Sequence, residues 1–334
     1  MGFPFRWVFP FRWVFPFRWV SHFDGFSRFD GFSRFDGLPP IANIHRPVGA
    51  FTFHFSLAMT LTLGFSPCPN DTFIFDAMIH NRIDTEGVNF EVIMEDVEAL
   101  NQRAFRRELA ITKLSYHAFA YLVDDYALLE SGSALGNGVG PLLIAKKEMT
   151  QDAVNQSIIA IPGKFTTANF LFSLAYPKAT NKQELVFHDI ENAVLDGRVG
   201  AGVIIHENRF TYQKRGLVKL MDLGAFWEET TKMPIPLGGI VVRRDLPLDI
   251  QQKVERIMKR SVEFAFEDPS VSKAFVAQHA QEMDEKVRQQ HIDLYVNDFT
   301  KSLGQQGRAA VETLFEQATL LKIIPTYARR IFLN

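Results

Sequence analysis

The sequence predicts an α/β fold built from two lobes around a central cleft. Short apolar runs alternate with amphipathic stretches from Leu61 onward, which is the strand–helix repetition of an α/β sheet. The same alternation starts again after about residue 150, which indicates a second sheet. After Pro247 the chain reads as helix almost to its end, so we expect these helices to pack back on the first lobe.

In the first lobe, each predicted strand is followed by a residue that can cap a helix. The apolar runs lie at 61–65, 89–94 and 110–114. The candidate capping residues are Asn70 or Asp71, Asp96 and Ser115. The three turns should therefore bring helix N-termini to one edge of the sheet.

The second lobe repeats this scheme. Two strands are predicted at 157–161 and 201–205, with helices between them that end near 174 and 198. Two further strands are predicted at 218–223 and 236–242. The chain should cross between the lobes near 145–155 and 235–245. We therefore predict that lobe 1 comprises 59–150 and 240–334, and that lobe 2 comprises 151–239.

The first 58 residues do not match this pattern. FPFRWV occurs three times without change over 3–20, and FDGFSR occurs twice over 23–34. A perfect six-residue repeat with neither helical nor strand period cannot place its aromatic residues on one face. We expect 1–58 to be a disordered extension outside the fold, most simply a start codon assigned upstream of Met59. An aromatic membrane tether is the alternative.

Composition and charge exclude several classes of protein. The net charge is −2, so the chain lacks the basic surface that binds nucleic acid. The single cysteine, Cys68, excludes an intramolecular disulfide and suits a reducing compartment. The sequence contains no run of eighteen apolar residues, so no membrane span is predicted. Residues 48–58 lack the charged-then-apolar order of a signal peptide. We expect a cytoplasmic protein.

Two motifs resemble cofactor or metal sites only in part. The glycine-rich stretch at 131–141 lacks the ending of a phosphate-binding loop and leads into an apolar run, so we interpret it as a turn before a strand. HENRF at 206–210 begins like a zinc motif, but Phe210 stands at the position of the second ligand. We therefore predict neither a cofactor nor a metal.

Polar residues at the predicted strand-to-helix turns favour a site for an anion. Lys113 and Ser115 lie at one turn, and Thr166 and Thr167 at another. Helix N-termini with nearby hydroxyl groups bind carboxylates well, although simple capping could explain each hydroxyl alone.

His206 and Cys68 are the candidate reactive residues. His206 ends an apolar strand at the edge of the sheet where α/β proteins bind ligands, so it could act on a substrate or merely face solvent. Cys68 lies between two prolines before a helix, where a rigid turn is a simpler interpretation than a catalytic thiol.

An ordered series of motifs resembles one enzyme family. SPCPNDTFIF, EDVEALN, TKLSYHA, SGSALGNGVGPL, PGKFTTA, AGVIIHENRFTY, MDLGAFWEE, PLGGI and YVNDF follow one another over 60–334. Together they are similar to the 1,4-dihydroxy-6-naphthoate synthases of the futalosine route to menaquinone.

This resemblance implies a fold, a reaction and a set of site residues. The fold is that of type II periplasmic binding proteins. The reaction is a cofactor-free lyase step that converts cyclic dehypoxanthinyl futalosine, an aryl carboxylate, to 1,4-dihydroxy-6-naphthoate and a sugar-derived fragment. The resemblance makes His206 the proton acceptor. It assigns substrate contacts to Lys113, Leu114, Ser115, Thr167 and Ala168.

Two other functions remain open at this point. A solute-binding protein would use the same cleft to hold a small carboxylate without reaction. Chorismate dehydratase is a sister enzyme on the same fold. The absence of an export signal and the position of His206 favour an enzyme, and the intact SPCPNDTF and IIHE motifs favour the synthase.

Overall fold

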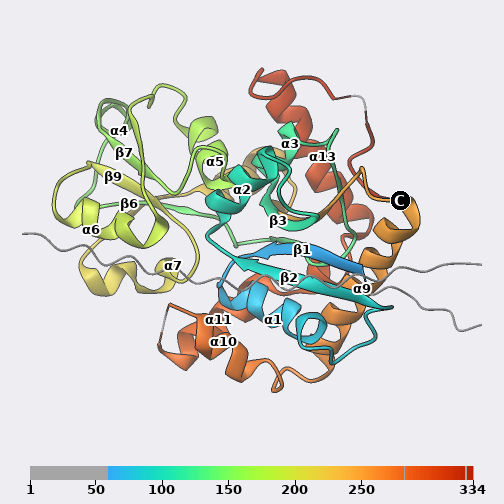
Figure 1. Cartoon of the computed structure of the whole chain (residues 1–334). Helices are drawn as coiled ribbons and strands as arrows, with labels where there is room; N and C mark the ends of the chain where they lie inside the picture. Colours follow the sequence, from blue (N-terminus) through green and yellow to red (C-terminus); the bar gives the residue numbers. More distant parts are fainter. Residues whose placement is uncertain (1–58, 282, 328, 334) are drawn as a thin grey trace, which may run out of the picture. The chain divides into compact units, whose positions relative to one another are not determined.

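The computed structural model describes residues 59–281, 283–327 and 329–333, so the predicted extension at 1–58 lies outside the described part. The strands of the first sheet are β1 (Met59–Phe65), β2 (Val88–Met94), β3 (Ile111–Ser115), β4 (Tyr126–Leu128), β5 (Ala134–Gly136) and β11 (Ile235–Arg243). Their order is β2-β1-β3-β11-β4, and β5 pairs with β11. Figure 1 labels β1, β2 and β3 of this sheet. The mixture of sheets and helices confirms the predicted α/β class.

The centre of the first sheet is the strand that positions the site. All five residues of β3 are buried, as expected for a strand covered on both faces. It runs parallel to β1 and antiparallel to β11. Because β1 and β3 are parallel, their carboxyl ends lie at the same edge of the sheet. Two helices begin at this edge, α1 (Pro69–Ile79) after β1 and α3 (Tyr116–Tyr121) after β3.

The second sheet contains β6 (Leu142–Ala145), β7 (Ile159–Ile161), β8 (Lys182–Glu184), β9 (Ala201–Ile204) and β10 (Val218–Asp222). Their order is β10-β6-β9-β7-β8. The apolar run of β6 pairs with β9 and β10, so the chain first passes between the sheets at 137–141. This passage precedes the predicted crossing near 145–155, because β6 completes the second sheet and not the first. The chain returns to the first sheet through 223–234, just before the second crossing predicted near 235–245.

The helices of the middle part lie along the chain between strands of the first or the second sheet. They are α2 (Val97–Phe105), which still belongs to the first sheet, α4 (Gln151–Gln156), α5 (Thr167–Ala175), α6 (Ile190–Leu195), α7 (Asn208–Thr211) and α8 (Leu223–Thr231). Two short 3₁₀ segments lie at Phe187–Asp189 and Tyr212–Arg215.

The C-terminal helices pack against α1 and the first sheet (Figure 1). They are α9 (Leu248–Glu267), α10 (Lys273–His279), α11 (Glu285–Tyr295), α12 (Asp298–Lys301) and α13 (Gly304–Leu320). In α9, Ser261 donates a 2.6 Å hydrogen bond to the Ile74 carbonyl of α1. The packing brings α11 beside the N-terminus of α1. Among the described helices, none is sufficiently long and apolar to cross a bilayer.

Candidate active site

A cavity lies where strands of both sheets end, with an empty volume of about 640 Å³ that includes solvent at its mouth. Five of the six predicted site residues line it: Lys113, Ser115, Thr167, Ala168 and His206. Part of the wall is apolar and is formed by Val97, Val139, Pro141, Ile205 and Leu237. Polar groups over an apolar wall are typical of sites that bind small molecules.

Leu114 is the sixth predicted residue, and it does not line the cavity. Its side chain is fully buried in the hydrophobic core. Successive side chains of a strand point to opposite faces, so the orientation that brings Lys113 and Ser115 to the cavity turns Leu114 away from it. A substrate contact of Leu114 would have to involve its backbone.

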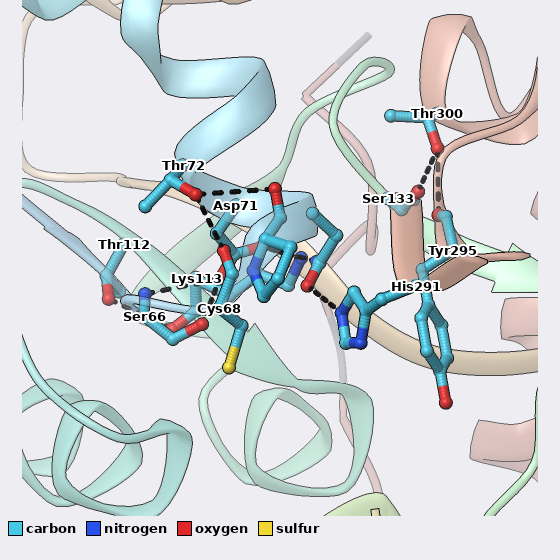
Figure 2. Close-up of polar contacts among 12 residues, drawn as sticks. Ser66, Cys68, Asp71, Thr72, Thr112, Lys113, Ser133, His291, Tyr295 and Thr300 are labelled. Carbon is cyan, nitrogen blue, oxygen red and sulfur yellow. Dashed lines mark hydrogen bonds and ion pairs between the residues drawn. The ribbon is translucent and has the colours of Figure 1, made fainter. Parts of the chain in front are cut away.

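Lys113 forms a buried ion pair with Asp71 (Figure 2). The Nζ–Oδ1 distance is 2.8 Å, and the two side chains are 7% and 2% exposed. Asp71 also accepts hydrogen bonds from the Ser66 hydroxyl at 2.7 Å and from the Ser66 backbone N–H at 3.2 Å. The carboxylate therefore has partners for its charge, which a buried charge requires. The pair links the end of β3 to the first turn of α1.

The cap of α1 differs from the prediction. Neither Asn70 nor Asp71 is the N-cap; the N-cap residue is Cys68, and Pro69 is the first helical residue. Proline suits that position because its φ is already helical and its missing N–H would have had no partner within the helix. Asp71 consequently lies inside the helix, where it can reach Lys113. The predicted cap Asp96 is confirmed, because its side chain accepts from the N–H groups of Glu98 and Ala99.

Ser115 is held by Asn101 of α2. Asn101 accepts a 3.1 Å hydrogen bond from the Ser115 N–H through Oδ1 and donates a 3.3 Å hydrogen bond to Ser115 Oγ through Nδ2. Since the amide donates to Oγ, the hydroxyl proton of Ser115 is left for another acceptor. Ser115 can therefore donate to an anion in the cavity.

The N-terminus of α5 forms the opposite wall. Thr166 caps it by accepting a 3.2 Å hydrogen bond from the Asn169 N–H. The Thr167 hydroxyl donates a 2.7 Å hydrogen bond to the carbonyl of Leu237, so its proton is already used. The N–H groups of Thr167 and Ala168 begin the helix and have no acceptor within it. These backbone groups, rather than the predicted Thr167 hydroxyl, can bind a carboxylate here.

His206 lies two residues after the end of β9 and has a left-handed backbone, with φ of 58°. His206 is half-buried as a residue, and its ring lies edge-on to Phe187, at 4.9 Å between centroids, and stacked near His291 at 5.9 Å. Burial lowers the pKa of His206 to about 4, with Asp71 opposing the shift and Lys113 adding to it. The imidazole is therefore neutral at physiological pH and can accept a proton.

His291 of α11 contacts Asn70 and Tyr295, which line the cavity, and the sequence did not reveal it. Its Nε2 lies 2.8 Å from Asn70 Oδ1, and Asn70 Nδ2 donates to Asp71 Oδ1 at 2.8 Å. Because the Asn70 oxygen can only accept, His291 carries its proton on Nε2. Burial lowers the pKa of His291 well below its usual value, so it is neutral too. Tyr295, one turn later, contacts the His291 ring and lines the cavity (Figure 2).

Cys68 and Glu207 lie beside His206. One ligand atom from each of these three side chains lies within 4.8 Å of the other two. Burial raises the pKa of the Cys68 thiol well above its usual value, so the thiol is protonated and is a weaker candidate base than His206. No local pattern predicts this cluster, because Cys68 and His206 come from different sheets.

Comparison with known proteins identifies the family. A family model described as menaquinone biosynthesis matches residues 61–319. The chain belongs to this menaquinone biosynthesis family. Two curated members are named 1,4-dihydroxy-6-naphthoate synthase. The one from Thermus thermophilus is 45% identical over 77% of this chain and 93% of its own length. The one from Streptomyces coelicolor is 43% identical over 80% of this chain and 96% of its own length.

Solved structures agree with the expected fold. Protein AF1704 from Archaeoglobus fulgidus is 36% identical, with a TM-score of 0.75 over 79% of this chain and 98% of its own. The alkanesulfonate-binding protein SsuA from Xanthomonas axonopodis is 13% identical, with a TM-score of 0.60 over 80% of this chain and 94% of its own. The latter likeness shows that this chain has the fold of such binding proteins, which confirms the expected fold.

Proposed function

We propose that this chain is a lyase that forms 1,4-dihydroxy-6-naphthoate from cyclic dehypoxanthinyl futalosine in menaquinone biosynthesis. The observation that carries the proposal is one cavity in which a neutral imidazole, His206, lies with donors suited to a carboxylate. Curated relatives with 43–45% identity have the same name as the proposed activity. We also propose a cytoplasmic location, in keeping with the single cysteine and the biosynthetic family.

The aryl carboxylate of the substrate would be bound by Ser115 and the N-terminus of α5. The Ser115 hydroxyl and the N–H groups of Thr167 and Ala168 can donate from two sides of the cavity. Lys113 adds positive charge nearby, although Asp71 compensates much of it. The flat ring would lie against the apolar wall around Val139 and Leu237.

His206 would act as the general base. Its neutral ring takes one proton from a carbon of the cyclised sugar portion, and the electrons of that C–H bond expel the leaving fragment. The remaining ring becomes aromatic, which supplies driving force. His206 becomes an imidazolium in this step, and the neighbouring Asp71 carboxylate favours that charge.

The proposal is tested by incubating the purified chain with cyclic dehypoxanthinyl futalosine and following 1,4-dihydroxy-6-naphthoate by mass spectrometry. We expect stoichiometric conversion. A parallel incubation with chorismate tests the sister dehydratase activity. Conversion of chorismate alone would replace the proposed function with that activity. Tight binding of the futalosine derivative without any product would favour the solute-binding alternative.

A further inference from the structure

We propose that Cys68, His206 and Glu207 form a binding site for Zn²⁺ beside the cavity. The three side chains offer a sulfur, a nitrogen and a carboxylate oxygen, which are the ligand types that zinc prefers. They come from the turn after β1 and from the end of β9, so the site joins segments of the two sheets.

The distances suit a tetrahedral ion after a small adjustment. Zinc–ligand bonds of about 2.0–2.3 Å place neighbouring ligand atoms about 3.4–3.8 Å apart. The three ligand atoms lie within 4.8 Å of one another, so each side chain needs to move by about 1 Å or less.

An independent observation at His291 also points to a cation. His291 carries its proton on Nε2, so Nδ1 presents a lone pair, and this buried atom has no hydrogen-bond partner within the described part of the chain. It faces Glu207 Oε2 at 3.9 Å, with the His291 side chain 1% exposed. Two acceptor atoms that face each other in a buried place are stabilised by a cation between them. His291 Nδ1 therefore borders the proposed site on the side of Glu207.

The surrounding charge favours a cation as well. The carboxylates of Glu207 and Asp71 and the ammonium of Lys113 act on the Cys68 thiol, so acidic groups outnumber basic ones among these three neighbours. Zinc binding would convert the Cys68 thiol to a thiolate and release its proton to solvent. It would also occupy the imidazole of His206, so Zn²⁺ should inhibit the proposed base.

Cobalt(II) gives the direct test, because it replaces zinc and its thiolate complexes absorb in the near ultraviolet. Cys68 is the only cysteine, so a thiolate-to-cobalt band can arise from no other residue. We expect one Co²⁺ per full-length chain, displaced by one Zn²⁺. Absence of saturable binding, or binding without this band, would overturn the proposal.

Matched variants identify the ligands. Cys68→Ser should abolish the band and weaken Co²⁺ binding at least about 10-fold, and Glu207→Gln should weaken binding while keeping the band. His80→Gln, at the far end of α1, should change neither. Unchanged affinity in both ligand variants would contradict the site. If Cys68→Ser does not fold, the wild-type band and Glu207→Gln still decide.

A turnover assay distinguishes the metal site from the proposed function. Only the predicted inhibition by Zn²⁺ rests on the proposed function; the metal site does not. Zn²⁺ should stop wild-type turnover at the concentrations that displace Co²⁺. The turnover of Cys68→Ser, normalised to its own metal-free rate, should be inhibited only at Zn²⁺ concentrations at least about 10-fold higher. Full cobalt occupancy with undiminished turnover would overturn the inhibition. A charge-transfer band in a chain that makes no dihydroxynaphthoate would support the metal site and count against the synthase function.

Discussion

Lys113 Nζ and Asp71 Oδ1 lie 2.8 Å apart in a nearly solvent-free pocket, and this ion pair connects the third strand of the first sheet to the first turn of α1. Both residues line the cavity. The pair therefore contributes to the stability of the fold and to the electrostatics of the site.

Breaking this pair on one side should destabilise the protein strongly. Asp71→Asn or Lys113→Met alone leaves one buried charge uncompensated, which typically costs about 3–5 kcal/mol. The double variant removes both charges and should recover a large part of that loss. The free energy of unfolding, measured by urea denaturation for the four proteins, checks this. Strictly additive losses would show that the two side chains are not coupled.

Ser115→Ala should weaken substrate binding more than Thr167→Val. A hydrogen bond from Ser115 to a carboxylate contributes about 1.5–3 kcal/mol, which corresponds to an increase in KM of roughly 10- to 150-fold. Thr167 donates its proton to the Leu237 carbonyl, so Thr167→Val should lower the free energy of unfolding by about 1 kcal/mol and change KM little. Steady-state kinetics and urea denaturation measure the two effects. A larger KM effect at Thr167 would reverse the assignment.

His206→Asn is the sharpest test of the proposed base. Asparagine tolerates the left-handed backbone at this position and can form hydrogen bonds, but it cannot take up the substrate proton. We expect kcat to fall about 10²- to 10⁴-fold with substrate affinity largely kept. His80→Asn, which changes an exposed histidine, serves as the control. A kcat close to that of the wild type would direct attention to Cys68 or Lys113.

The pH dependence of catalysis should reflect the lowered pKa of His206. The neutral ring is the active form, so activity is lost only when pH falls through a pKa of about 4, well below the usual 6.5 of histidine. We expect kcat/KM to stay level between pH 8 and about 5 in short assays in which the protein remains folded. A fall in kcat/KM centred near pH 6.5 would mean that His206 is solvated like an ordinary histidine.

As the pH is lowered, the free energy of unfolding should begin to decrease at a higher pH than kcat/KM does. Burial lowers the pKa of His117 to about 4 and that of His291 well below 6.5, whereas both bind protons near pH 6.5 in the unfolded chain. The unfolded state therefore binds more protons below pH 6.5, and each group lowers the free energy of unfolding by up to about 1.4 kcal/mol per pH unit. Urea denaturation at pH 7, 6 and 5 measures the slope. His117→Gln should reduce it, and a pH-independent stability would contradict these pKa shifts.

The fold could be predicted where one local pattern determines an element. The strand predicted at 110–114 is β3 at Ile111–Ser115, and all five of its residues are buried although three of them are polar. The helix predicted after Pro247 begins as α9 at Leu248, since its apolar residues repeat with helical period. The stretch 131–141 was predicted as a turn, but it contains the strand β5 at Ala134–Gly136, which pairs with β11, before it leads into β6. The pairing of β6 with β9 and β10 could not be predicted, because strand pairing is not a local property.

The candidate site was predictable only in part. Sequence placed His206 and Ser115 at the ends of strands, and both line the cavity. It did not identify His291, because the hydrogen bond to Asn70 spans 221 positions and depends on how α11 packs against α1. The use of the Thr167 hydroxyl by Leu237 likewise depends on the distance between α5 and β11.

The left-handed backbone of His206 affects which residues can replace it during evolution. A non-glycine residue in this conformation costs about 1–2 kcal/mol, and glycine would remove that cost. Histidine at position 206 can transfer a proton but has the cost of the left-handed backbone, whereas glycine would avoid that cost and could not transfer a proton. Selection for thermal robustness alone would favour glycine at position 206, and selection for turnover would oppose it.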